Sequence, residues 1–226
     1  MRLRDCLGVI LIVSFAMSET SWAGPLDPRG EIHVPIGVAN SVDALKTFVE
    51  AEGNFSPGFA TYGVYFWCYD RDRRTVVAPT MDDVPCEPGL AGTGTLIPFS
   101  RWSVGELVVK TEVCQVERDS PAGKIQVVAA RVHLTNGGDT VSKLSLLAAL
   151  RPLGAAGGPV DQLAVSDRGD ALLVDNRPAL IAGEASKIAG ASEKDNVGDM
   201  LRWGKFPPAN VRLPIPATAP AHSGSM

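Results

Sequence analysis

The chain has 226 residues and a formal net charge of −4 at pH 7. This length accommodates one large domain or two small ones. Because the sequence is mildly acidic and has no block of basic residues, we expect neither nucleic acid nor an anionic membrane as its main partner. Beyond the N-terminus, no apolar stretch is long enough to predict a membrane span.

The first 23 residues have the features of a secretory signal peptide. Arg2 and Arg4 precede an apolar run from Cys6 to Met17, which is shorter than the roughly 20 residues of a membrane-spanning helix. Small residues at Ser21 and Ala23 then match the positions that a signal peptidase reads. We expect cleavage after Ala23 and a secreted or periplasmic protein with no membrane span. The alternative is an uncleaved N-terminal anchor.

Three cysteines, Cys68, Cys86 and Cys114, would remain after the leader and Cys6 are removed. An oxidising compartment permits one disulfide and one free thiol. We predict the pair Cys68–Cys86, whose loop would contribute about 3 kcal/mol by chain entropy. Pairs with Cys114, or three free and buried thiols, are the alternatives. The spacings match no zinc pattern, and no metal or cofactor is expected.

Residues 41–52 carry the one helical pattern that precedes residue 190. Ser41 is a candidate N-cap, and Val42, Leu45 and Val49 recur at helical spacing. We therefore predict a short helix in this segment.

From residue 61 onward, runs of aromatic and β-branched residues alternate with turn sequences, a pattern typical of strands. Three runs in close order, separated by strong turn signals, predict an antiparallel meander. Residues 79–94 are expected to be a long loop. Apolar residues that share a face are Leu107, Val109 and Val113 on the first strand of the meander, and Ile125, Val127 and Ala129 on the second. The expected strands span residues 61–69, 75–78, 107–117, 124–134, 141–150, 160–165, 171–174 and 178–182.

Strands at this spacing favour a mainly all-β fold, an antiparallel β-sandwich with one short helix. We assign this domain to residues 24–206, after a signal peptide at residues 1–23. Residues 207–226 are rich in Pro and Ala and lack periodicity, so we expect a linker or a disordered tail.

No established catalytic motif is present, and no catalytic residue is predicted. A Cys114–His133 dyad is conceivable on neighbouring strands, but a buried structural cysteine and an edge histidine are favoured. Asp82, Asp83 and Glu87 could bind calcium or serve a hydrolase of unfamiliar type. A solvated acidic turn is favoured, since a glycosidase pair must face across a cleft.

The aromatic strand offers a binding hypothesis. Tyr65, Trp67 and Tyr69 share one face, which could stack on sugar rings, and Trp102 is a further candidate ligand-binding residue. The alternative is a central strand with both faces covered.

Several short motifs occur in a suggestive order: Trp67-Cys68-Tyr69-Asp70, Leu96-Ile97-Pro98, Leu150-Arg151-Pro152 and Asn176-Arg177-Pro178. This order resembles the N-terminal β-sandwich of bacterial glycoside hydrolases with an (α/α)6 barrel, of the glucoamylase or glycogen-debranching type. The similarity covers roughly residues 61–182. Arg151 is expected to be structural, its guanidinium pairing with a carboxylate at the end of the sheet.

In enzymes of that family, a helical barrel follows the sandwich and carries the catalytic carboxylates. This chain instead ends in the Pro-rich segment, so no catalytic residue can be carried over. The resemblance implies an exported, non-catalytic module that packs on an (α/α)6-barrel partner or helps to hold a polysaccharide or oligosaccharide. The alternatives are a stand-alone glycan-binding protein and a truncated or split glycoside hydrolase.

Overall fold

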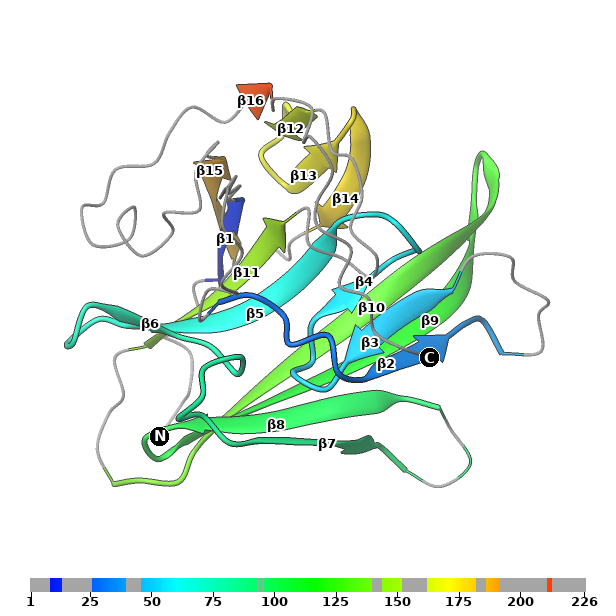
Figure 1. Cartoon of the computed structure of the whole chain (residues 1–226). Coiled ribbons are helices and arrows are strands. Elements are labelled where there is room, and N and C mark those ends of the chain that lie inside the picture. The colour runs from blue at the N-terminus through cyan, green and yellow to red at the C-terminus, as the bar shows by residue number, and fades with distance from the viewer. Residues whose placement is uncertain are drawn as a thin grey trace.

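The computed structural model describes residues 9–13, 26–39, 46–92, 94, 96–139, 144–151, 162–181, 186–191 and 211–212. All helices or strands assigned within these ranges are strands, and they form three sheets (Figure 1). The predicted all-β class is therefore confirmed. The predicted cleavage site at Ala23 and most of the predicted tail lie outside the described residues.

The largest sheet has eight strands, and we call it the upper sheet. Strand β5 (Gly63–Asp70) is central: it pairs antiparallel with β11 (Leu144–Arg151), β4 (Phe55–Ser56) and β6 (Thr75–Val77). The sheet continues beyond β4 through β3 (Thr47–Glu50) to β2 (His33–Ile36). Beyond β11 it continues through β1 (Val9–Val13) and β15 (Ser186–Ala191), which pair in parallel.

The second sheet, the lower sheet of Figure 1, has the order β10–β9–β8–β7. Strands β9 (Leu107–Ser120) and β10 (Gly123–Asn136) form a long hairpin that pairs without a bulge from Ser120↔Gly123 to Leu107↔Asn136. Strands β8 (Pro98–Val104) and β7 (Cys86–Leu90) complete this sheet. A third, small sheet has the order β14 (Arg177–Ile181), β13 (Ala171–Val174), β12 (Gln162–Val165) and β16 (Val211–Arg212).

The main core lies between the upper and lower sheets, as in a β-sandwich. Phe66 and Leu150 of the upper sheet pack in one cluster with Val113 of β9 and with Leu172 of the third sheet. Further along the same interface, Cys68 packs with Trp102 of β8 in a second cluster, together with Leu107, Val109 and Leu146. Burial of this apolar surface, at about 25 cal/mol per Å², is the main stabilising contribution.

The segment predicted as a helix, residues 41–52, contains a strand in the structure. Residues 47–50 form β3, which pairs with β2 on one side and β4 on the other, and residues 40–45 lie outside the described residues. The pairing buries Thr47 and Val49. Tertiary pairing on both edges therefore overrides the helical spacing of the apolar residues. No helix occurs in the described ranges.

The predicted meander is correct for its first two strands and wrong for its third. Strands β9 and β10 form the expected hairpin, but β11 crosses to the upper sheet and pairs with β5. The physical reason is visible in β11 itself, since Leu146 to Arg151 are all buried. A strand that is apolar on both faces requires a central position covered on both sides. The predicted loop at residues 79–94 also contains strand β7.

We predict that the turn between β3 and β4 tolerates no side chain at Gly53. Its φ is +84°, and an added Cβ would lie 2.8 Å from Ser100 Cβ and 3.2 Å from Thr111 Cβ. Gly53→Ala should lower the free energy of unfolding by about 3 kcal/mol, because backbone strain and overpacking add. Gly169→Ala is the control: its φ is +70° but the Cβ would meet nothing within 4 Å. It should cost only about 1 kcal/mol in urea unfolding. Equal losses would show that the turn is not packed against the lower sheet.

Candidate functional site

The four predicted ligand-binding rings are buried. Tyr65 and Trp67 are each 1% exposed, and Tyr69 and Trp102 are buried as well. The first three share one face of β5, as expected, and pack together beneath Leu26, Val76 and Met81. Trp102 lies elsewhere, between the two sheets against Cys68. The structure thus brings three of the four rings together, as a covered core.

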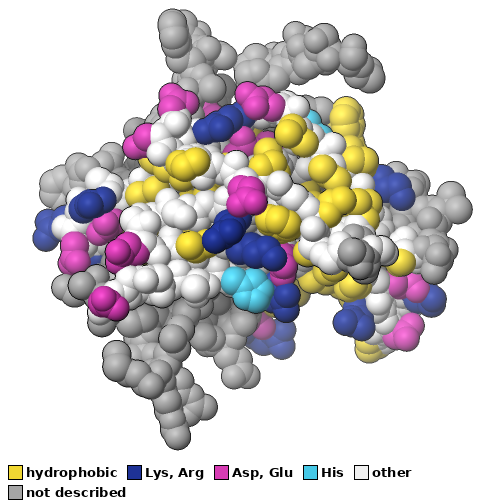
Figure 2. All heavy atoms as spheres, turned by 90° about the horizontal axis from the view of Figure 1, so that it is seen from below, with side chains coloured by type: hydrophobic (Ala, Val, Ile, Leu, Met, Phe, Trp, Pro, Cys, Tyr) yellow, Lys and Arg dark blue, Asp and Glu magenta, His cyan; other side chains and the backbone are white. Residues whose placement is uncertain are grey.

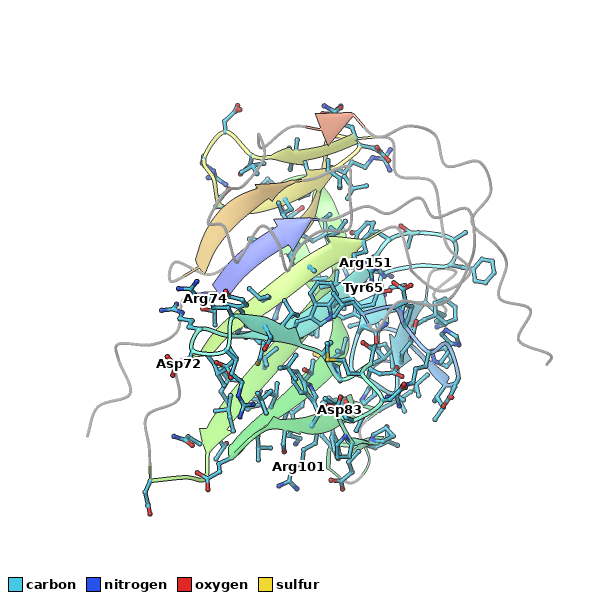
Figure 3. All side chains as sticks on the ribbon, turned by 60° about the vertical axis from the view of Figure 1, so that its left-hand side comes forward. Tyr65, Asp72, Arg74, Asp83, Arg101 and Arg151 are labelled. Carbon is cyan, nitrogen blue, oxygen red and sulfur yellow. The ribbon has the colours of Figure 1, made fainter. Side chains whose placement is uncertain are left out.

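Arg151 connects these rings to the segment that covers them (Figure 3). Its side chain is 2% exposed, and its guanidinium carbon lies 5.3 Å from the Tyr65 ring centre and 5.6 Å from that of Trp67. Nη1 donates to the Leu26 carbonyl at 2.6 Å, and Nη2 donates to Asp27 Oδ1 at 2.5 Å. The expected pairing of Arg151 with a carboxylate is therefore confirmed. Cation–π contacts and a charge-assisted hydrogen bond together hold this buried charge.

Residues 26–36, which we call the strap, run over the aromatic face and end in β2. Besides the Arg151 contacts, the strap is held by Arg29, whose Nη2 donates to the Met81 carbonyl at 2.9 Å. Arg29 Nε also lies 3.8 Å from Glu52 Oε1. At its far end, His33 Nε2 lies 3.5 Å from Glu50 Oε1. The strap is thus fixed along its length by polar contacts to the upper sheet and its turns.

Two of these contacts end on buried carboxylates, and we call Glu50, Glu52 and Asn54, in the β3–β4 turn, the acidic turn. The turn is tight: the Glu50 amide donates to the Asn54 carbonyl at 2.9 Å, and the Gly53 amide donates to the Glu50 carbonyl at 3.0 Å. All three side chains are buried, and the side chain of Glu50 is only 3% exposed. Glu50 Oε2 and Asn54 Oδ1 have no hydrogen-bond partner within the described structure.

Burial raises the pKa of Glu50 to about 7, and the neighbouring charge of Glu52 adds to this shift. The nearby side-chain amide of Asn54 and the backbone amide of Gly30 oppose it by favouring the charged form. Burial raises the pKa of Glu52 too, while Arg29 opposes that shift. A carboxyl that titrates near neutral pH can take up or release a proton under ordinary conditions, which is the chemistry this arrangement supports.

The acidic turn was not predicted from the sequence. The helical spacing of residues 41–52 predicts a helix, and charged residues on an amphipathic helix face solvent. The signal that could have identified the turn is Glu52-Gly53-Asn54, because Gly and Asn favour tight turns. The burial of Glu50 depends on the strap, which is distant in sequence and leaves no local signature.

The predicted disulfide is wrong for this structure, in which Cys68, Cys86 and Cys114 are all free thiols. Cys68 points from β5 into the apolar interface, and burial raises its pKa to about 12. Cys86 lies on β7, where its sulfur is 2.8 Å from Ser100 Oγ and 3.2 Å from the Ala51 carbonyl oxygen. The two thiols thus have different neighbours in different sheets.

The other residues considered as catalytic or metal-binding candidates do not form a site in the part of the chain that the structure describes. Asp82 and Asp83 are exposed in a turn, and Glu87 is exposed on β7, 3.8 Å from Arg101. Cys114 lies opposite Ala129, whereas His133 Nε2 is 3.5 Å from Glu112 Oε2. Across the residues that the structure describes, no three His, Cys, Asp or Glu side chains are placed to hold a metal ion.

The outer face of β9 and β10, turned away from the upper sheet, carries both charged and exposed apolar side chains. Glu112 lies at its centre and accepts hydrogen bonds from Lys110 Nζ and Arg131 Nη2, each at 2.7 Å. These bonds lower the pKa of Glu112 to about 2. Lys110 Nζ also lies 4.6 Å above the Phe99 ring.

Toward the hairpin turn, this face becomes apolar. Val127 lies opposite Val116, and Ile125 lies opposite Arg118. Ile125 is 46% and Val127 is 36% exposed. The predicted shared face of Ile125, Val127 and Ala129 therefore points to solvent rather than into the core. Seen from below, the molecule has hydrophobic side chains gathered beside charged ones and a histidine (Figure 2).

Comparisons of the chain with protein-family models, with curated proteins and with solved structures returned no match. Within the described ranges, there is also no helix with the length and apolar character of a membrane span.

We predict that protonation of Glu50 makes the fold more stable in mild acid than in mild base. The pKa of Glu50 is higher in the folded chain than in the unfolded chain, so its stabilising contribution is complete below about pH 4.5 and decreases as the pH rises to about 7. Between pH 5 and pH 8, wild type should lose about 2 kcal/mol more than Glu50→Gln, in which the neutral amide cannot titrate. Urea unfolding at both pH values measures this difference. Parallel pH profiles of the two proteins would contradict the assignment.

Proposed function

We propose that this chain is an exported, non-catalytic β-sandwich module that packs on a catalytic partner, as the accessory domains of (α/α)6-barrel glycoside hydrolases do. Three lines of reasoning support the proposal: the export signal read from the sequence, the order of the motifs at residues 67–178, and the sandwich-like all-β fold. The single observation that favours packing is the exposed apolar end of the β9–β10 outer face.

The chemistry of this face suits a protein partner. Ile125 and Val127 provide apolar surface, and burying one such side chain fully is worth about 1.5–3 kcal/mol. Next to them, the ion pairs of Glu112 with Lys110 and Arg131 form a charged border. An apolar centre beside charged residues is the usual composition of a protein interface.

Glycan binding by the aromatic strand has less support. A sugar ring needs an accessible aromatic face, and Tyr65 and Trp67 are buried beneath Leu26 of the strap, Val76 and Met81. Such binding would require these covering residues to leave the rings. A role as one part of a split glycoside hydrolase is compatible with the packing proposal, since the same face could then meet the separately encoded barrel.

We predict that Val127→Lys prevents association with the partner without unfolding the module. The probe is the purified product of an adjacent reading frame that encodes a helical barrel, titrated with the secreted chain by calorimetry. Wild type should bind, and Val127→Lys should bind at least about tenfold more weakly, because a charge replaces buried apolar surface. Ser103→Lys is the control, since Ser103 is exposed on β8, where it pairs with Val108 near the start of β9 and away from the β9–β10 turn.

A parallel titration with starch, glycogen and cell-wall glycans separates the two functions. Binding of a glycan by wild type and by Val127→Lys alike, with no binding of the barrel protein, would overturn the packing proposal. That result would favour a stand-alone glycan-binding protein.

A further inference from the structure

We propose that the free edge of β10 pairs antiparallel with β10 of a second copy of this chain, so that the two lower sheets join into one continuous sheet. The inference concerns the hydrogen-bonding edge of β10, whereas the packing role proposed above concerns the outer face of β9 and β10. Neither depends on the other.

Strand β10 is an end strand of the lower sheet with a long, regular edge. It spans 14 residues, Gly123–Asn136, pairs with β9 without a bulge and contains no proline. Most of its residues are exposed. A long, flat and exposed end strand presents a row of unpaired backbone amides and carbonyls, which can pair with a further strand.

The register of the hairpin identifies the backbone groups that point to this edge. Ser120 and Gly123 flank a two-residue turn and form a hydrogen-bonded pair, so Gly123 and every second residue after it bond to β9. The alternate residues direct their amides and carbonyls away from β9. From the middle of the strand onward, these residues are Val128, Ala130, Val132 and Leu134. Among the described strands, only β9 pairs with β10.

The other strands at the ends of the described sheets lack such an edge. They are two to six residues long, and three of them, β2, β7 and β14, contain Pro35, Pro88 and Pro178. Proline has no backbone amide to donate, so it prevents pairing at an edge. The described strand that matches β10 in length and has an open edge is therefore β10 of another copy. Because Pro88 lies at the opposite end of the lower sheet, association should stop at two copies.

The side chains of β10 allow two copies to approach each other. Within residues 125–136, the ionisable side chains are Arg131 and His133. Both lie beside the same carboxylate of β9: Arg131 Nη2 donates to Glu112 Oε2 at 2.7 Å, and His133 Nε2 lies 3.5 Å from that oxygen. The charge of Arg131 is thus balanced within its own chain. The side chains that alternate with these on β10 are apolar, namely Val128, Ala130, Val132 and Leu134.

The side-chain sequence favours a twofold axis at Ala130. Antiparallel pairing about this axis places Val128 opposite Val132, and Ala129 opposite Arg131, so no two like charges face each other. An axis at Arg131 would instead place two guanidinium groups opposite each other. Ala130 is exposed and small, so its side chain can lie beside that of the second copy.

Sedimentation equilibrium of the full chain, with a charge swap at the axis, tests this pairing. Wild type at about 50 μM should be largely dimeric. Ala130→Lys and Ala130→Glu should each weaken self-association at least about tenfold, because like charges then lie directly opposite each other. An equimolar mixture of the two variants should restore dimers, since opposite charges face each other. Ser103→Lys is the control, because Ser103 is exposed on β8 away from this edge, and it should associate as wild type does.

A monomeric wild type would overturn the inference and would leave the packing role of the outer face untouched. Undiminished dimers of Ala130→Lys and Ala130→Glu, or weakening that the mixture does not reverse, would also overturn it. If the variants do not fold, hydrogen exchange of wild type decides. On dilution from about 100 μM to about 1 μM, peptides of residues 128–134 should lose protection relative to peptides of β8, and a constant ratio contradicts the pairing.

Discussion

The arrangement of this molecule depends on one buried charge, the guanidinium of Arg151. Strand β5 carries large side chains on both faces, so it can be central only if a second layer covers the face opposite the lower sheet. Arg151 provides the anchor for that layer, because it binds Leu26 and Asp27 of the strap while lying against Tyr65 and Trp67. A buried guanidinium without these partners would be strongly destabilising, so strap, rings and arginine form one interdependent unit.

The strap also contacts the acidic turn, and these contacts differ from those with Arg151. Arg151 is paired with Asp27, whereas Glu50 is buried with an unpartnered oxygen and its pKa is raised to about 7. The proposed packing surface on β9 and β10 lies elsewhere, on the outer side of the lower sheet.

Features that depend on residues close together in the sequence could be predicted, whereas features that depend on pairing between distant segments could not. The hairpin of β9 and β10, the strand β5 and the pairing of Arg151 with a carboxylate could be read from local patterns and from a charge at a strand end. Three features could not be read in this way: the crossing of β11 to the other sheet, the conversion of residues 47–50 from helical spacing to β3, and the burial of Glu50. Each is decided by pairing with segments that are distant in sequence. The rings were correctly placed on one face, but the sequence did not show that Leu26 of the strap, Val76 and Met81 cover this face.

A double-mutant cycle between Arg151 and Asp27 tests most directly whether the covered aromatic core depends on this arginine. The free energy of unfolding would be measured by urea denaturation for wild type, Arg151→Met, Asp27→Asn and the double variant. We expect Arg151→Met to cost about 3 kcal/mol and the two changes to be coupled by more than about 1 kcal/mol, because they disrupt the same buried contact. Additive effects within about 0.5 kcal/mol would show that the strap is held without this ion pair and would contradict its central role.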